Sequence, residues 1–212
     1  MSEIHRIRCG NVNCYIVENG SGGVLVDTGR REFARRVLEA CRRYRVRLIV
    51  LTHGHFDHAE NAAFLSEALG VPIGMSGRDL DLISSNANQA LSAETLLGKV
   101  VLSASLREFS RRSMRVFEPE VLLQEGDCLT DYGIDARIVA LPGHTEGSIG
   151  LDVEETNLVV GDALMNMFYP TVSMLFHNRG AMLESAEKIS TLGRRMLYFG
   201  HGRPVFNRQW VK

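Results

Sequence analysis

Three histidines and one aspartate gather in the short segment Thr52-His53-Gly54-His55-Phe56-Asp57-His58, directly after the apolar run Leu48-Ile49-Val50-Leu51. The chain has only 7 histidines among its 212 residues, so this clustering needs a chemical explanation. Imidazole and carboxylate groups are the ligands that Zn²⁺ and similar cations take in proteins. Glycine at position 54 lets the chain turn sharply. The segment therefore predicts a metal site in a loop that follows a strand.

The spacing inside this segment indicates two groups of ligands. In extended backbone His53 and His55 point the same way, because side chains repeat every two residues. The adjacent residues Asp57 and His58 must point in different directions, which favours a second subsite. The alternative is a polar loop with solvated histidines, but that interpretation leaves the apolar strand before the loop unexplained.

Three later segments repeat the layout of an apolar strand, a glycine and then a residue of ligand type. They are Ile138-Val139-Ala140-Leu141-Pro142-Gly143-His144, Leu158-Val159-Val160-Gly161-Asp162 and Met196-Leu197-Tyr198-Phe199-Gly200-His201. Glycine before the ligand lets the backbone turn and approach a metal closely. Taken singly, each segment is ordinary turn chemistry, but together they offer three further ligands.

Length and composition exclude several classes of function. A chain of 212 residues with 45% hydrophobic residues can bury its own core, so a single domain over residues 1–212 is expected. The formal net charge of −1 gives no field that recruits nucleic acid or an anionic membrane. The start lacks an apolar signal region, and no segment approaches the roughly 18 apolar residues of a membrane span. We therefore expect a cytoplasmic protein whose 4 cysteines stay reduced.

Apolar periodicity and turn residues predict the elements that position these ligands. The expected strands are 3–9, 12–18, 24–28, 47–51 and 71–75, and the expected helices are 30–44 and 58–69. Strand, helix and strand alternate around the ligand segment as in a crossover unit, which places its chemistry at the carboxyl ends of strands. Asp27 follows the third strand, where it either orients a metal ligand or simply closes the strand.

Residues 77–120 differ from the rest because they contain no histidine and no motif. Apolar stripes predict one helix from Leu80 to Leu91 and two further pieces, one over 96–102 and one from Leu106 to Phe117. The section is expected to form a helical insertion whose apolar faces are buried either over the site, as a cap, or against a second copy in a homodimer.

The ordered set of motifs resembles the metallo-β-lactamase-fold hydrolase superfamily, in particular its glyoxalase II-like and lactonase-like members. The family pattern T-H-x-H-x-D-H stands here at residues 52–58, followed by Pro142-Gly143-His144-Thr145, Gly161-Asp162 and Gly200-His201. The resemblance covers nearly the whole chain. It implies an α/β fold, an αββα sandwich of two mixed β-sheets flanked by helices, with a dinuclear metal site at one edge.

The resemblance also implies a set of seven ligands. It puts one cation on His53, His55 and His144, a second on Asp57, His58 and His201, and Asp162 between them. Two Zn²⁺ ions are expected, with iron or manganese as the alternatives. A pair of cations can share a hydroxide that attacks the substrate and can stabilise the charge that develops. Asp57, as a carboxylate beside that water, is a candidate to orient it or accept its proton, so both Asp57 and Asp162 are candidate catalytic residues.

Departures within the family narrow the expected reaction. Many true β-lactamases of this fold have cysteine where Asp162 stands, so the resemblance favours a small-molecule ester, thioester or lactone as substrate. A phosphodiesterase or an RNA-processing nuclease is the alternative, kept open by the arginines of residues 107–115. A third class, in which metals only hold the fold together, is disfavoured because a dinuclear set leaves open positions for water.

Three residues between Asp162 and the last expected helix, Ala181 to Leu192, are candidates for substrate binding. They are Tyr169, His177 and Arg179, on a loop expected to border the metals. The alternatives are a packed aromatic ring, a surface histidine and a solvated charge.

Overall fold

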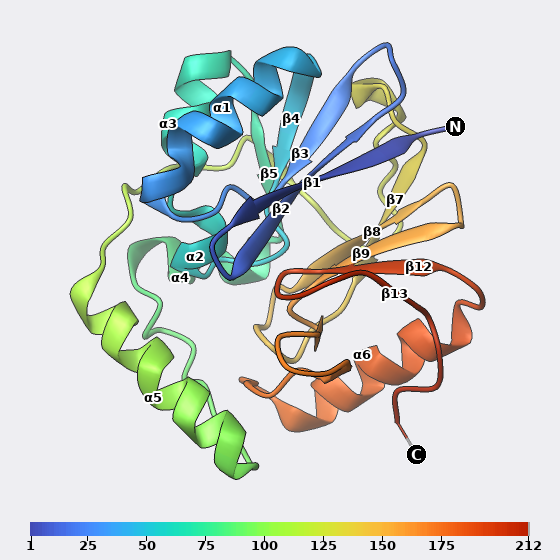
Figure 1. Cartoon of the computed structure of the whole chain (residues 1–212). Helices are drawn as coiled ribbons and strands as arrows, with labels where there is room; N and C mark the ends of the chain where they lie inside the picture. Colours follow the sequence, from blue (N-terminus) through green and yellow to red (C-terminus); the bar gives the residue numbers. More distant parts are fainter. Residues whose placement is uncertain (212) are drawn as a thin grey trace.

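A computed structural model describes residues 1–211 of the chain (Figure 1). Its first sheet has six strands in the order of the sequence. Strands β1 to β3 are antiparallel neighbours and β3 to β6 are parallel, so the sheet is mixed. The strands are β1 (Glu3–Cys9), β2 (Val12–Glu18), β3 (Gly23–Val26), β4 (Val46–Val50), β5 (Ile73–Met75) and β6 (Val121–Leu122).

The second sheet has five strands in the order β13-β12-β9-β8-β7 and is also mixed, because β12 pairs parallel with β9 while the other pairs are antiparallel. A two-stranded ribbon of β10 and β11 lies beside it in the chain. The strands are β7 (Ala136–Ala140), β8 (Ile149–Val153), β9 (Asn157–Gly161), β10 (Leu164–Met165), β11 (Thr171–Val172), β12 (Met196–Phe199) and β13 (Val205–Phe206).

Three buried clusters hold the layers together. The cluster between the two sheets joins residues such as Val24 and Leu48 of the first sheet to Ile138 and Leu151 of the second. A second cluster packs helices α1 (Ala34–Arg43) and α3 (Ala62–Leu69) on the outer face of the first sheet, and a third packs α6 (Arg179–Thr191) on the second sheet. Figure 1 shows the resulting order of helix, sheet, sheet and helix. The αββα sandwich with mixed sheets is confirmed.

The helix expected over residues 58–69 is instead two helices. Helix α2 (Phe56–Ala59) is a single turn that carries ligand residues, and α3 starts at Ala62 after a break. The Asn61 side chain donates to the carbonyls of Thr28, Gly29 and Arg30, which ties the break to the loop after β3. Gly70 ends α3 in the left-handed conformation with φ 66°, as expected for a helix stop.

The insertion over residues 77–120 is less helical than predicted. It contains α4 (Leu80–Ser84) and one continuous helix α5 (Leu96–Arg111), while residues 85–95 and 112–120 are irregular. Short 3₁₀ turns occur at Arg31–Phe33, Gly77–Asp79 and Thr130–Tyr132. The prediction of two separate pieces after residue 95 is wrong, because residues 103–105 continue the helix without a break. Within residues 1–211, no helix has the length and apolarity that crossing a bilayer requires.

Candidate metal centre

The seven expected ligands meet at one edge of the sandwich, where the strands of both sheets end. His53 and His55 follow β4, Asp57 and His58 lie on α2, and the other three follow β7, β9 and β12. Their ligand atoms form three overlapping groups in which all atoms lie within 4.8 Å of one another. The groups are His53 with His55 and His144; His53 with His58 and Asp162; and Asp57 with His58 and His201.

Asp162 is the residue that connects the groups. Its two carboxylate oxygens lie 3.7 Å from His58 Nε2, 3.7 Å from His144 Nε2 and 3.2 Å from His201 Nε2. Asp57 reaches only one side, where its Oδ2 lies 3.7 Å from His201 Nε2. The Asp162 carboxylate thus faces His144 on one side and His58 and His201 on the other, and a carboxylate in this position can bridge two cations.

Buried polar atoms without partners test whether this cluster suits a cation. His53 Nε2, His55 Nε2, His58 Nε2 and Asp162 Oδ1 are fully buried and make no hydrogen bond. An unsatisfied buried polar atom costs about 1–3 kcal/mol, and more when it is charged. Four such atoms directed at one small volume therefore fit the donor set of a metal site, because a bound cation satisfies all of them at once.

Four of the histidines use Nδ1 for a second hydrogen bond, which leaves Nε2 to face the cluster. Carbonyl and carboxylate acceptors require a proton on Nδ1, which fixes the tautomer of His58, His144 and His201; for His53 the Thr52 hydroxyl donates its proton to Asp27 and so accepts from Nδ1. The partners are the Thr52 hydroxyl for His53 at 3.0 Å, Asp27 for His58 at 2.8 Å, the Leu175 carbonyl for His144 at 2.8 Å and the Asn11 carbonyl for His201 at 2.8 Å. His55 differs, since its Nδ1 lies 3.0 Å from His144 Nε2.

Asp27 orients a ligand and therefore does more than close its strand. In addition to His58, its carboxylate accepts hydrogen bonds from the backbone and hydroxyl of Thr52. It sits in the left-handed region with φ 61°, a conformation in which aspartate is among the tolerated residues. The sequence left open whether Asp27 orients a metal ligand or simply closes its strand, and the contact with His58 supports the first interpretation.

The pKa shifts differ between the two sides of the cluster: those of His53 and His55 are lowered, whereas those of His58 and His201 are raised, so a cation on the second side must displace protons. Burial and then the neighbouring imidazoles hold the pKa of His53 and His55 well below the usual value, so both rings keep free lone pairs. Burial also lowers the pKa of His58, but nearby carboxylates led by Asp27 outweigh it and raise that pKa to about 10. For Asp162, burial is outweighed by the neighbouring imidazoles, which hold its pKa well below the ordinary range. Ionised Asp162 supplies negative charge for a cation.

The glycines before the ligands are required by close contact, as the sequence predicted. A Cβ on Gly161, which has φ 53°, would lie 2.7 Å from the Thr52 side chain, and a Cβ on Gly200 would collide with the Asp162 carboxylate. Larger residues at these positions would push the ligand loops apart.

A cavity of about 280 Å³ opens over the cluster. Its polar floor includes His55, Asp57, His144, Asp162 and His201, and its opposite wall is formed by α5 with Val101, Ala104 and Phe109. The Phe109 ring packs on the His55 ring with centroids 5.1 Å apart. Met165, Met167 and Leu175 extend the apolar wall on the other side. The ligand cluster therefore faces a mainly apolar chamber.

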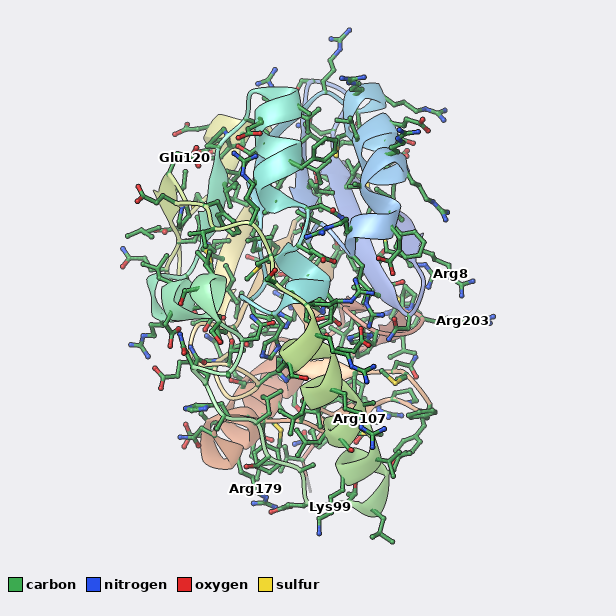
Figure 2. All side chains as sticks on the ribbon, turned by 90° about the vertical axis from the view of Figure 1, so that its left-hand side faces the viewer. Arg8, Lys99, Arg107, Glu120, Arg179 and Arg203 are labelled. Carbon is green, nitrogen blue, oxygen red and sulfur yellow. The ribbon has the colours of Figure 1, made fainter. Side chains whose placement is uncertain are left out.

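The three expected substrate contacts lie elsewhere, because none of them lines this cavity. Arg179 begins α6 and pairs with Glu94 at 2.7 Å, and Figure 2 shows it at the surface. Tyr169 lines a separate shallow pocket that also includes Arg179. His177 contacts the Ala90 carbonyl at 3.0 Å and Glu146 at 3.3 Å, so it connects two loops. Their role in substrate binding stays a prediction, for a position outside the lining of this cavity.

Sequence reasoning missed several residues that hold the ligand loops. Asn13 donates to the Phe199 and Gly202 carbonyls on either side of His201, and Asp79 accepts hydrogen bonds from two ligand loops. Asp79 stands four residues after β5, at a carboxyl strand end like the ligands themselves. That position was the available signal, but no glycine precedes it directly.

A family model described as the metallo-beta-lactamase superfamily matches residues 7–201. The chain belongs to this superfamily. An uncharacterized protein from Aquifex aeolicus is 30% identical over 156 residues. The matched part covers 72% of this chain and 65% of that protein, so this chain spans less than two thirds of the relative's length. A protein named hydroxyacylglutathione hydrolase GloC from Haemophilus influenzae is 28% identical over 168 residues, 76% of this chain and 71% of that one.

Two solved structures have the same fold. The BLEG-1 B3 metallo-beta-lactamase superposes with a TM-score of 0.74 at 22% identity, over 96% of this chain and 94% of that one. TTHA1623, solved in a di-iron-bound form, gives a TM-score of 0.68 at 24% identity, over 95% and 94%. These likenesses establish the arrangement of the sheets and helices described above.

Proposed function

We propose that this protein is a dinuclear metal-dependent hydrolase that cleaves a small-molecule ester, thioester or lactone with an apolar acyl group. The observation that carries the proposal is a buried cluster of ligands with unsatisfied atoms, which opens into an apolar chamber. His53, His55 and His144 would hold one cation, and Asp57, His58 and His201 the other, with Asp162 between them. Two Zn²⁺ ions are the first choice, and iron is the alternative in view of the di-iron-bound neighbour.

The residues of this chain divide the work between binding and proton transfer. When bound, the cations supply a water activated near neutral pH and a Lewis acid for the carbonyl oxygen. Asp57, whose side chain is 15% exposed, borders the cavity and would orient that water and accept its proton. Phe109 and its neighbours on α5 exclude bulk solvent from the reacting carbonyl and hold the acyl group against the floor.

Two observations support acyl over phosphoryl chemistry. The relatives include proteins named hydroxyacylglutathione hydrolase, whose substrate is a thioester. The arginines that kept the nuclease alternative open are partly neutralised, because Arg112 contacts Glu32, Glu60 and Glu108, and Arg115 pairs with Glu67. Side chains already paired with carboxylates offer little charge to a phosphate backbone.

A cytoplasmic location belongs to the same proposal. The Sγ atoms of Cys9 and Cys14 lie 3.7 Å apart as buried free thiols, a state that a reducing compartment maintains.

The test is a substrate panel on protein reconstituted with Zn²⁺, Fe²⁺ or Mn²⁺. It compares thioesters and lactones of increasing acyl length with aryl esters and with bis-p-nitrophenyl phosphate. We expect the highest kcat/KM on an acyl substrate, loss of that activity with a chelator and its return with metal. Faster turnover of the phosphodiester than of every acyl substrate would contradict the proposal.

A further inference from the structure

Asp79 is a buried carboxylate that the chemistry proposed above does not use. It ends the 3₁₀ turn Gly77–Asp79 after β5, and its side chain is fully buried with no cationic partner among residues 1–211. Burying an ionised carboxylate is costly unless hydrogen bonds compensate. Its position thus requires a set of donors, and the identity of those donors reveals what the residue does.

Four donors surround this carboxylate, two on each oxygen. Oδ2 accepts from the backbone N–H of Gly54 at 3.0 Å and from the hydroxyl of Thr145 at 2.7 Å. Oδ1 accepts from the backbone N–H of Gly147 at 2.7 Å and from the Gln89 amide at 3.2 Å. A carboxylate has about four acceptor sites, so the group is fully satisfied.

The donors identify the loops that Asp79 joins. Gly54 lies between His53 and His55, and Thr145 follows His144 directly, so one carboxylate connects the loops of all three histidines of one group. The contact is close, because a Cβ on Gly147 would lie 2.7 Å from the Asp79 carboxylate. The other group, which contains His58 and His201, is held by different residues.

Those residues are Asp27 for His58, and Asn11 and Asn13 for the loop of His201. No hydrogen bond described for residues 1–211 runs from Asp79 to these elements. Asp79 thus contacts loops of the three-histidine group alone, whereas Asp27 contacts His58 directly and the loop of His53 through Thr52.

We propose that Asp79 is a positioning residue that sets the metal affinity of the three-histidine group and leaves the Asp57, His58 and His201 group unaffected. It fixes the separation of the His53–His55 loop from the His144 loop before a cation binds. Asparagine at this position accepts on one atom only, and its NH₂ group faces donors on the other side. At least one of the two loops then loses its support and the three nitrogens spread.

The experiment isolates each group before it measures affinity. His201→Ala leaves the three-histidine group intact, and His144→Ala leaves the other. In each background Zn²⁺ affinity is measured by competition with a chromophoric chelator, and the Co²⁺ absorption spectrum reports the geometry. We expect Asp79→Asn to weaken binding about 10- to 100-fold in the first background, in line with other residues that orient metal ligands, and less than about twofold in the second.

Asp152→Asn is the matched control, because it removes a largely buried carboxylate whose described hydrogen bonds go to Arg195, directly before β12, and to no ligand loop. It should leave Zn²⁺ affinity in both backgrounds unchanged. If Asp79→Asn fails to fold, Thr145→Val replaces it, since that substitution removes one of the four donors without changing the side-chain volume greatly. Unchanged affinity in the first background, or equal weakening in both, would overturn the proposal.

Discussion

The floor of the cavity and the helix above it are built in opposite ways. The floor consists of five of the seven expected ligands, with His53 and His58 behind them, and all seven except Asp57 are buried. Helix α5 has a single buried residue, Gly98, while Leu96, Val100 and Leu106 are 84%, 68% and 47% exposed. Figure 1 shows α5 lying apart from the sandwich, and in Figure 2, which faces α5, Lys99 and Arg107 point away from it.

This difference separates what a hydrolase must fix from what it can vary. Ligand positions have to be held within a few tenths of an ångström, and the floor histidines His144 and His201 are each held by a hydrogen bond from Nδ1 to a backbone carbonyl. The wall that would contact the proposed acyl group needs only shape and apolar surface. An element with few contacts tolerates substitution, so we expect selectivity to change mainly through α5.

The largest effect should come from the residue that connects both halves of the floor. Asp162→Ala removes the carboxylate that faces ligands of both groups, so bound metal should fall from two equivalents to one or fewer. We expect kcat/KM on the best acyl substrate to drop by more than about 100-fold. Elemental content and kinetics are measured together. Asp131→Ala, at an exposed position, is the control, and an Asp162→Ala protein with two equivalents and wild-type rates would refute the bridging role.

An intermediate effect is expected where the helix meets the floor. Phe109→Ala removes the ring that packs on His55, which enlarges the chamber without removing a ligand. We expect kcat/KM for long acyl chains to change about 3- to 10-fold relative to short ones, with metal content unchanged, since each CH₂ group that changes its burial is worth about 0.8 kcal/mol, or about fourfold.

Leu106→Ala is the matched control for Phe109→Ala, because Leu106 lies on the same helix but is exposed. Identical acyl preferences in the two variants would show that α5 does not shape the substrate. Ile83, which the apolar pattern also suggests as a cap residue, is unsuitable for this test, since it belongs to the core cluster under the first sheet.

The smallest expected effect concerns the pH dependence of stability, through a cysteine on helix α1. Burial raises the pKa of Cys41, on α1, from 9.0 to about 12. The thiol therefore ionises in the unfolded chain at a lower pH than in the folded one. Its contribution is fully present below pH 9 and is lost as pH rises from 9 toward 12. We expect the urea midpoint to fall across this window, and the fall to be shallower in Cys41→Ala.

Leu106→Ala is also the control for this measurement. A substitution on the exposed helix should lower the urea midpoint by the same amount at every pH. If Cys41→Ala and the wild type lost stability with the same slope between pH 9 and 12, the buried thiol would not be the source. Cys14 and Tyr15, whose pKa values burial also raises, contribute equally in both proteins and set the remaining slope.

Most of the floor was predictable from sequence, whereas the helix above it was not. The ligands could be recognised because the pattern of a strand, a glycine and a ligand residue recurs along the chain, and because the motifs resemble a known family. The extent of α5 could not be judged in the same way: its apolar residues, such as Leu96 and Val100, are exposed, so their spacing does not mark a buried face. Asp79 was missed since its importance comes from donors such as Thr145, 66 positions away in the chain.

Helix α5 is held at both ends, and this determines how a substrate reaches the floor. Before its first turn Ser92 pairs with Phe176, the Thr95 hydroxyl caps the helix by accepting from the Gly98 N–H, and after its last turn Arg112 pairs with Glu60. A helix of 16 residues spans about 24 Å, so these supports stand far apart. A doubly supported helix does not swing open as a lid. The width of the passage is then set by side-chain rotamers, which exchange within nanoseconds, and diffusion past them requires no slow conformational step.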